Sequence, residues 1–372
     1  MPGTTSTPDF TLATIKDLNA LVTIENRCFE IDRMSSRSIK HMIQKANCDF
    51  ILGWKNNVIV GYALVLYHQG THLARLYSFA VLPEVRGQGV GEQLLQQAEE
   101  YATSRDCIYM RLEVHPNNSG AIRLYKKLGY HPFGMYHDYY EDHADALRFE
   151  KRILFCEDQR DLLPVPYYQQ TTDFTCGSAC LIMAMQALGT EAKADRILEI
   201  QLWREATTIY MTSGHGGSSP LGLALAAWRR GFRVEVYINT EEPLFLDGVR
   251  NEEKKAVMQL VHEEFVAQIK ATDIRINYNK ITLSELEEKM DAGGIPLVMI
   301  SSYSYTRDKA PHWVVMSGID ETFVYIHDPH EDEDTYRSQT DNIHLPVARQ
   351  TFDNSFRFGK TALRTSVIIY NR

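Results

Sequence analysis

The chain has 372 residues, of which 44% are hydrophobic and 23% are charged, a composition typical of a folded globular protein. Because domains average roughly 100–200 residues, this length predicts two domains. The formal net charge of −9 argues against binding to a nucleic-acid backbone, so small molecules or peptides are the expected partners.

Membrane and secretion signals are not recognisable in the sequence. No apolar run reaches the roughly 18 residues of a membrane span, and the opening segment MPGTTSTPDF lacks the basic and apolar regions of a secretion signal. The six cysteines form no paired C-x-x-C spacing, which argues against a disulfide framework and against a zinc site. We therefore expect a cytoplasmic protein without a membrane segment or a metal.

The first half of the chain alternates between strand and helix patterns. A short strand near residue 10 precedes a helical period over residues 18–24. Two strands then flank Lys55-Asn56-Asn57, a turn-forming triplet that predicts a β-hairpin. A further strand, ARLYSFAVL, ends at Pro83, and a helix begins after residues 86–91. Its apolar residues share one face: Leu94, Leu95, Ala98 and Ala102.

The segment Arg86-Gly87-Gln88-Gly89-Val90-Gly91 is rich in glycine at the start of this helix. Backbone without side chains approaches a phosphate closely, and helix N-terminal amides bind anions, so the segment predicts a pyrophosphate-binding loop. The alternative is a turn that only closes a strand-helix corner. The spacing fits neither a dinucleotide fingerprint nor a Walker loop.

A strand, a loop and a short helix follow in YMRLEVHPNNSGAIRLYKKLGY, and together with the glycine loop they resemble the GNAT superfamily of acetyltransferases over about residues 8–155. Arg86-x-x-Gly89-x-Gly91 resembles that family's acetyl-CoA loop, and Asn118-x-x-Ala121-Ile122-x-Leu124-Tyr125 resembles its later motif. The resemblance implies a GNAT fold with a mixed central sheet and acetyl-CoA as co-substrate. The implied cofactor-binding residues are Val81, Arg86, Gly87, Gln88, Gly89, Val90, Gly91 and Asn118.

Within that superfamily the segment is similar to bacterial enzymes that acetylate the N-terminal alanines of ribosomal proteins. The similarity implies Glu113 as base, Tyr125, 12 residues later, as acid, and Tyr139 and Tyr140 as substrate-binding residues. These residue types suit the reaction, because an ammonium group must lose a proton before it attacks a thioester, and a phenol can protonate the departing thiolate. Taken alone, each would be a surface glutamate or a core-edge tyrosine. His115 differs from the residue that is usual at this position of the motif.

Charge and proline mix in FCEDQRDLLPVPYY, which predicts a domain boundary. We assign residues 1–156 to the first domain, 157–163 to a linker and 164–372 to the second domain. Helices are predicted from Cys176 to Leu188, around 194–204 and over 221–230, before the strand FRVEVYI. Ser219-Pro220 suits the start of a helix, so Gly214-His215-Gly216-Gly217 is interpreted as a loop.

The end of the chain changes to strand patterns. Thr282-x-x-Glu285 predicts a capped helix, and three buried strands follow in IPLVMISSY, HWVVMSGID and TFVYIHDP. His312 opens the second of these strands and Asp328 closes the third, 16 residues later. Antiparallel pairing of the two strands would bring both side chains together.

Cys176 stands at the start of the first helix of this half. A thiol reacts as thiolate, and a helix N-terminus and an imidazolium both lower the pKa of a cysteine. The imidazole needs an acceptor on its other nitrogen, so Cys176, His312 and Asp328 can form a nucleophile, a base and an orienting group. Cys180, one turn further on, is assigned to packing.

Residues 164–372 resemble the bacteriocin-processing branch of papain-like cysteine peptidases. The matching motifs are Gln170-x5-Cys176-Gly177, His312-Trp313-Val314-Val315 and Asp328-Pro329. The resemblance implies a papain-like α+β fold, with a helical part and an antiparallel sheet, in which Gln170 donates a hydrogen bond to the oxyanion. The whole chain is then expected to be an α/β (α+β) two-domain protein.

Structural roles are the alternative for each of these residues. Cys176 can be a small buried residue, His312 a strand residue and Asp328 part of a turn. A metal site formed by His327, His330, Asp332 and Asp334 is a further alternative, but a solvated acidic loop is favoured because no ligand spacing recurs.

The sequence thus predicts an acetyl-CoA-dependent N-acetyltransferase joined to a cysteine peptidase or amidase, with a peptide or protein as substrate. Two other functions stay open: a C-terminal domain that only binds peptides, and a protein that binds CoA as a sensor without turnover. The sequence predicts no oligomeric state.

Overall fold

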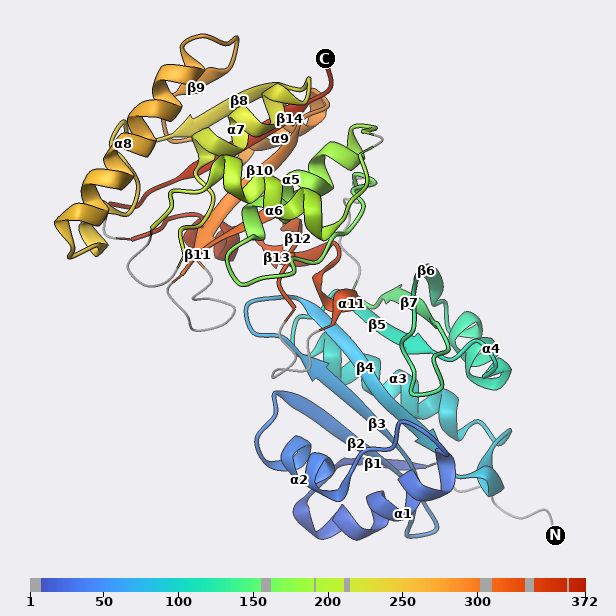
Figure 1. Cartoon of the computed structure of the whole chain (residues 1–372). Helices are drawn as coiled ribbons and strands as arrows, with labels where there is room; N and C mark the ends of the chain where they lie inside the picture. Colours follow the sequence, from blue (N-terminus) through green and yellow to red (C-terminus); the bar gives the residue numbers. More distant parts are fainter. Residues whose placement is uncertain are drawn as a thin grey trace. The chain divides into compact units, whose positions relative to one another are not determined.

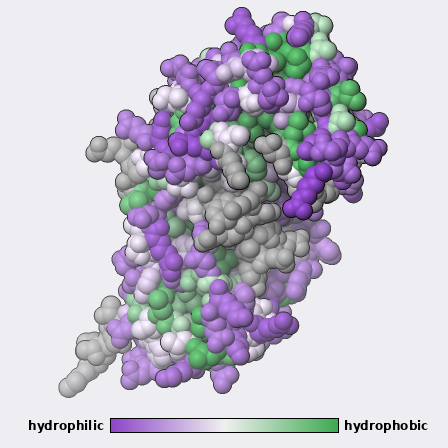
Figure 2. All heavy atoms as spheres, turned by 90° about the vertical axis from the view of Figure 1, so that its left-hand side faces the viewer, coloured by the Kyte–Doolittle hydropathy of each residue, from purple (hydrophilic) through white to green (hydrophobic). Residues whose placement is uncertain are grey.

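The computed structural model describes residues 8–154, 162–190, 192–210, 215–301, 310–331, 338–359 and 361–372. The chain forms two compact units, Met1–Glu157 and Asp158–Arg372, and each has its own sheet and its own hydrophobic core (Figure 1). No helix among the described residues is long and apolar enough to cross a membrane. On the face drawn in Figure 2, hydrophilic residues predominate and hydrophobic residues form scattered groups.

The N-terminal unit is built on a seven-stranded mixed sheet with the strand order β1-β2-β3-β4-β5-β7-β6. Strands β4 and β5 run parallel, and the other neighbouring pairs run antiparallel. The strands are β1 (Asp9–Leu12), β2 (Cys48–Lys55), β3 (Val58–Tyr67), β4 (Leu73–Val81), β5 (Tyr109–Val114), β6 (His131–Tyr136) and β7 (Ala146–Arg152). The helices are α1 (Leu18–Cys28), α2 (Ser36–Gln44), α3 (Val90–Thr103) and α4 (Ser119–Lys127), with short 3-10 turns at Ile15–Asp17 and Pro83–Val85. The predicted mixed sheet is confirmed.

The hairpin between β2 and β3 has the predicted turn. Asn56 and Asn57 have φ angles of 52° and 61°, so both central residues adopt the left-handed conformation that a two-residue turn of this kind requires. Asparagine tolerates this conformation better than most residues, which explains why the triplet predicts the turn.

The parallel pairing of β4 with β5 is short and positions the candidate site. It runs from Leu73 opposite Tyr109 to Leu76 opposite Leu112, although both strands continue further. At this point Tyr77 is an extra residue in β4, because Leu76 and Ser78 face consecutive residues of β3. Such a bulge bends its strand. Glu113 therefore lies directly beyond the last residue of β5 that pairs with β4, while it still pairs with Arg148 of β7.

The C-terminal unit has a second seven-stranded sheet, with the order β13-β12-β11-β10-β14-β8-β9. Its strands are β8 (Arg233–Ile238), β9 (Arg275–Asn277), β10 (Ile295–Ser301), β11 (Pro311–Ile319), β12 (Phe323–His327), β13 (Leu345–Ala348) and β14 (Thr365–Tyr370). The pair β8 and β9 is parallel and the remaining pairs are antiparallel. The helices are α5 (Cys176–Ala187), α6 (Arg196–Ala206), α7 (Pro220–Arg229), α8 (Glu252–Ile269), α9 (Leu283–Asp291), α11 (Gln339–Asn342) and α12 (Arg349–Ser355), with a 3-10 turn at Leu246–Gly248.

Helix α5 lies in the core of this unit. It packs on β10 and β11 and also contacts α6 and α7, and its residues 176–185 are all buried. A helix that is covered on every side is apolar all round, which explains the run CLIMAM. The core therefore holds the start of α5, and with it Cys176, in a fixed place.

Several predicted local signals are present in this unit. Strands β10, β11 and β12 occur where three buried strands were predicted. Ser219 caps α7 with Pro220 in its first turn, and Thr282 and Glu285 form the capping box of α9. Helix α8 was not predicted, since its buried residues, Met258, Phe265 and Ile269, are too sparse to give a clear period.

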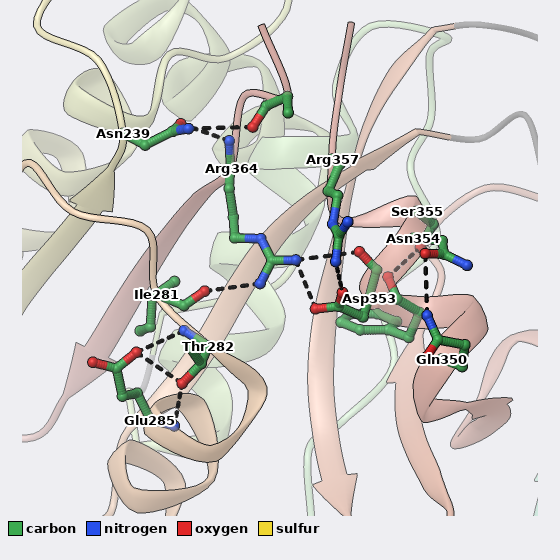
Figure 3. Close-up of polar contacts among 12 residues, drawn as sticks. Asn239, Ile281, Thr282, Glu285, Gln350, Asp353, Asn354, Ser355, Arg357 and Arg364 are labelled. Atoms are coloured by element: carbon green, nitrogen blue, oxygen red, sulfur yellow. Dashed lines mark hydrogen bonds and ion pairs between the residues drawn. The ribbon is translucent and has the colours of Figure 1, made fainter.

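Arg364, the residue before β14, contacts the segment that precedes α9 and also contacts α12 (Figure 3). Its guanidinium is 2% exposed and donates to the Ile281 carbonyl oxygen at 3.0 Å and to Asp353 Oδ1 at 2.6 Å. Its backbone N–H donates to Asn239 Oδ1 at 2.8 Å. A buried cation needs such partners, so we assign this cluster to stabilisation of the fold.

Candidate active sites

The glycine loop adopts the backbone conformation that its glycines permit. Gly87 and Gly89 have φ angles of +75° and +83°, and a Cβ added at either would meet nothing within 4 Å. Glycine is thus required by backbone angle and not by lack of space. Gly89 is also the N-cap of α3, so no cap side chain covers the first amides of that helix. The loop fits the predicted pyrophosphate group, because open amides and space meet there.

Side chains of the loop fold back onto the protein. Arg86 Nε donates to the Val81 carbonyl oxygen at 2.9 Å, and Gln88 Nε2 donates to the Glu84 carbonyl oxygen at 3.0 Å. Lys55 Nζ in turn donates to Gln88 Oε1 at 2.7 Å. These contacts hold the side chains of Arg86 and Gln88 against the protein. Val90 and Gly91 form the first turn of α3.

Asn118 is the N-cap of α4, and its Oδ1 accepts from the Ala121 N–H at 3.1 Å. This contact explains why an asparagine starts the helix. Its predicted part in cofactor binding stays a prediction.

Glu113 is a buried carboxylate with one paired and one unpaired oxygen. Its side chain is 4% exposed, and Oε2 accepts from Arg75 Nε at 3.0 Å. Oε1 is buried and has no hydrogen-bond partner among the described residues. Arg75 also donates from Nη2 to the Tyr139 hydroxyl at 3.1 Å. A carboxylate oxygen without a partner can accept a hydrogen bond from an amine.

Arg75 was missed by the sequence interpretation. Arg75 lies opposite Arg111 in the parallel pair of β4 and β5, and Arg111 is two residues before Glu113 on the same face of β5. Only knowledge of the strand register connects the two residues.

Tyr125 lies in α4 with 5% of its surface exposed, and burial raises its pKa above the ordinary value of 10. Tyr140 interacts electrostatically with both Glu113 and Tyr125, and burial together with these neighbours raises the pKa of Tyr140 as well. The structure therefore brings the predicted base, the predicted acid and a predicted substrate-binding tyrosine into one region. A phenol with a raised pKa stays protonated at neutral pH, as an acid must.

Aromatic rings and His115 surround this region. The ring centroids of Tyr139 and Tyr140 are 4.9 Å apart, and that of His115 is 5.0 Å from Tyr140. His115 Nε2 lies 3.2 Å from Asp142 Oδ2, and its Nδ1 accepts from the Asn117 N–H at 3.1 Å. His115, the departure from the usual motif, thus links the loop after β5 to the loop before β7.

In the C-terminal unit, the structure brings Cys176, His312 and Asp328 together. Cys176 is the first residue of α5 and is 7% exposed. The antiparallel register of β11 and β12 places Val315 opposite His327, and His312 Nε2 lies 2.7 Å from Asp328 Oδ1. His312 also interacts electrostatically with Cys176.

The charges of this group support a reactive thiol. Burial opposes ionisation of Cys176, but His312 and the backbone N–H groups of Trp313 and Gly177 lower its pKa below the ordinary 9.0. Burial likewise disfavours charge on His312, but Asp328 and Cys176 raise its pKa to about 10. Both shifts favour a thiolate and an imidazolium over two neutral groups.

Gln170 lies near this group but is engaged elsewhere. Its Nε2 donates to the Thr172 carbonyl oxygen at 3.0 Å and lies 3.4 Å from His330 Nδ1, and its backbone N–H donates to the Pro329 carbonyl oxygen at 3.0 Å. Its Oε1 is buried without a hydrogen-bond partner among the described residues. Donation to an oxyanion would require this side chain to turn, so that role stays a prediction.

The neighbours of the nucleophile are closely packed. A Cβ added at Gly177 would lie 2.7 Å from Ser218 Cβ and 3.0 Å from Trp313 Cδ1, so glycine is the residue that fits after Cys176. Trp313 Nε1 donates to the Ser218 carbonyl oxygen at 3.1 Å. Cys180 is fully buried, and burial raises its pKa well above 9.0, as suits a packing residue.

Both nitrogens of His327, a ligand of the alternative metal site, are engaged. Nε2 lies 2.9 Å from the Val165 carbonyl oxygen, and Nδ1 accepts from the His344 N–H at 2.9 Å. Asp332 and Asp334 lie outside the described residues. Among the residues that the structure covers, no group of three or more histidine, cysteine or acidic residues could hold a metal.

Comparison with known proteins assigns both units. Residues 18–130 match the Acetyltransferase (GNAT) family, so the N-terminal unit is a GNAT acetyltransferase domain. Residues 165–370, more than half of the chain, match the Peptidase_C39 like family, and the chain belongs to that family. Both predicted family resemblances are confirmed.

The relatives of the N-terminal unit are N-acetyltransferases. An uncharacterized N-acetyltransferase of Methanocaldococcus jannaschii is 33% identical over 138 residues, which span 37% of this chain and 86% of that protein. A candidate ribosomal protein bS18-alanine N-acetyltransferase of Bacillus subtilis is 28% identical over 36% of this chain and 87% of that protein. The crystal structure of the ribosomal-protein-S18-alanine N-acetyltransferase of Escherichia coli is 24% identical, with a TM-score of 0.37, and covers 42% of this chain and 100% of that one.

Proposed function

We propose that the chain has two enzymatic activities: acetyl-CoA-dependent acetylation of a peptide or protein N-terminus, and cleavage or transfer at an amide through a papain-like cysteine site. The observation that carries the second activity is the cluster of Cys176, His312 and Asp328, in which His312 Nε2 lies 2.7 Å from Asp328 Oδ1 and His312 lowers the pKa of the Cys176 thiol. The GNAT family match and the half-paired carboxylate of Glu113 support the first.

For acetyl transfer, Arg86 to Gly91 would hold the pyrophosphate of acetyl-CoA, which supplies an acetyl group activated as a thioester. Oε1 of Glu113 would accept a proton from the incoming ammonium group, while the hydrogen bond from Arg75 Nε to Oε2 holds the carboxylate in place. The protonated Tyr125 hydroxyl would give a proton to the departing thiolate. Tyr139, held by Arg75, and Tyr140 would line the path of the peptide.

For peptide cleavage, the Cys176 thiolate would attack the carbonyl carbon of an amide, and the amine would leave with a proton from His312. Asp328 orients the ring and stabilises its charge. Water would then release the acyl group from Cys176. Both activities would then act on one peptide: cleavage would expose an N-terminal amine, and acetylation would block it.

A peptide library incubated with the full chain and acetyl-CoA, and then analysed by mass spectrometry, tests both activities. We expect acetylated N-termini that Glu113→Gln abolishes, and cuts that Cys176→Ala abolishes. Each variant serves as the control for the other, because each should retain the activity of the opposite unit.

The open alternatives predict different results. Acetylation without cuts in any library would favour a peptide-binding C-terminal unit, and failure to release CoA thiol with any amine would favour a CoA sensor.

A further inference from the structure

The turn formed by Asp328, Pro329 and His330 carries the carboxylate of the cysteine site at the end of β12. Asp328 Oδ1 lies 2.7 Å from His312 Nε2 and also accepts from the His330 N–H at 2.9 Å. An aspartate commonly binds the backbone two residues further on in this way, and the contact makes a compact turn. The direction of the carboxylate toward His312 therefore depends on the conformation of the turn.

The segment that leads to Cys176 holds one side of this turn. The Tyr167 hydroxyl donates to the Asp328 carbonyl oxygen at 3.0 Å, and the Gln170 N–H donates to the Pro329 carbonyl oxygen at 3.0 Å. Two of the three carbonyl oxygens of the turn are thus held by this segment.

Asn342, the last residue of α11, holds the same turn through two further contacts. Its backbone oxygen accepts from the Asp328 N–H at 3.0 Å, and its Nδ2 donates to the His330 carbonyl oxygen at 2.8 Å. Asn342 is fully buried, and its Oδ1 has no hydrogen-bond partner among the described residues. A buried polar atom without a partner costs about 1–3 kcal/mol. The contribution of this side chain is therefore its hydrogen bond to His330.

We propose that Asn342 is a positioning residue of the cysteine site, which keeps residues 328–330 in the conformation that directs Asp328 toward His312. The inference rests on the cysteine chemistry proposed above and adds a residue that acts through Asp328. Asp328 stabilises the charged form of His312, and His312 in turn stabilises the thiolate of Cys176. Loss of the Asn342 side chain should therefore change the ionisation of Cys176, which a purely structural role would not do.

Asn342→Leu tests this in the full chain, because leucine is similar in size but neither donates nor accepts a hydrogen bond. The variant leaves the groups that act directly on Cys176 unchanged, namely His312 and the backbone N–H groups of Trp313 and Gly177. The probe is iodoacetamide, whose methylene carbon bonds to Sγ while iodide leaves. Its rate is measured by mass spectrometry between pH 5 and pH 10, and the labelling midpoint is the pH of half-maximal rate.

We expect the labelling midpoint of Cys176 to rise by about half to one pH unit in Asn342→Leu. Below both midpoints the labelling rate then falls about threefold to tenfold, because one pKa unit is a tenfold change in thiolate. Thermal unfolding should change little, since the variant removes the unpartnered Oδ1 together with the donor. If Asn342→Leu does not fold, Asn342→Ala takes its place with the same expected shift of the midpoint.

A double variant shows whether Asn342 acts through Asp328. In an Asp328→Asn background, Asn342→Leu should add no further shift, because the carboxylate that it positions is gone. Asn239→Leu is the matched control. Asn239 also accepts from a backbone N–H, that of Arg364 at 2.8 Å, and donates to a carbonyl oxygen, that of Ala362 at 3.2 Å. It follows β8, which three strands separate from β12, so its loss should leave the labelling midpoint unchanged.

An unchanged midpoint in the Asn342 variants would overturn the inference alone, even if they unfold at a lower temperature. Shifts of Asn342→Leu and Asp328→Asn that add in the double variant would also overturn it. A wild-type Cys176 with a labelling midpoint at or above the ordinary 9.0 would overturn the proposed cysteine chemistry as well.

Discussion

At the scale of single residues, the ionisation of Cys176 predicts how its reactivity depends on pH. The alkylation rate follows the fraction of Cys176 that is thiolate. Burial raises the pKa of Cys176, but His312 and nearby backbone N–H groups lower it further, so that it lies below 9.0. In His312→Ala the largest of the lowering groups is gone while burial remains, so we expect the pKa of Cys176 to rise above 9.0. We expect the alkylation rate at pH 7 to fall at least about tenfold, because one pKa unit is a tenfold change in thiolate.

The measurement is iodoacetamide labelling between pH 5 and pH 10, with mass spectrometry of each cysteine. Cys107 is an internal control, since burial raises its pKa to about 12 and it should not react below pH 9. Asp328→Asn should raise the midpoint by less than His312→Ala, because it only removes a group that raises the pKa of His312. An unchanged midpoint in both variants would contradict the assigned pair.

The ion pair of Arg75 and Glu113 is a second feature at this scale. Both side chains are nearly inaccessible, at 3% and 4% exposure, so removing Arg75 leaves the Glu113 carboxylate buried without this ion pair. Arg75→Gln should lower the free energy of unfolding of the N-terminal unit by about 3–5 kcal/mol. Urea denaturation followed by hydrogen exchange of the β4 and β5 peptides would measure this.

The double variant Arg75→Gln, Glu113→Gln is the decisive comparison, because it removes both charges. It should recover part of the stability that Arg75→Gln loses, since no unpaired carboxylate remains. If the losses in the free energy of unfolding of the two single variants add up in the double variant, the two side chains do not stabilise each other.

At the scale of elements, the loop before α3 predicts how its glycines respond to substitution. Gly89 has a φ of +83°, which costs an L-residue roughly 1–2 kcal/mol, so Gly89→Ala should destabilise the unit by about that amount. Gly89→Asn should cost less, because asparagine tolerates this conformation. Thermal unfolding measures both, and CoA titration should show weaker binding to Gly89→Ala.

Gly91 is the matched control for stability. It lies in the first turn of the same helix, and a Cβ there would meet Leu124 Cδ2 at 3.5 Å, an ordinary contact. Gly91→Ala should therefore not destabilise the helix. Equal destabilisation at both positions would argue against backbone angle as the cause.

Local structures that depend on residues close together in the chain could be predicted from the sequence. The hairpin at Asn56 and Asn57 and the capping box of Thr282 and Glu285 are examples, because each pattern determines its own local geometry. His312 and Asp328 were also predicted to meet, since two adjacent strands with a short turn have one simple pairing.

Contacts between segments that are distant in the chain could not be predicted in this way. Glu199 reaches the segment 168–175 only because α5 and α6 pack together, and nothing in the sequence of α6 marks it among the other glutamates. Arg75 reaches Glu113 only through the register of a parallel pair. These residues depend on tertiary packing, which no local pattern specifies.

At the scale of the whole molecule, the chain is two folding units in sequence. One core contains buried residues from Ile51 to Phe149, and a separate core contains residues from Val165 to Ile369. Each sheet is formed entirely by strands of its own unit. A unit with its own sheet and core has what independent folding requires.

We therefore expect fragments 1–157 and 158–372 to fold when they are produced separately. The first should acetylate the same N-termini as the full chain, and the second should keep the low-pH alkylation of Cys176, because each candidate site is built from residues of one unit. Circular dichroism and thermal unfolding of each fragment would establish folding, and the two assays would establish function. A fragment that is active only after mixing with the other would show instead that the units complete one another.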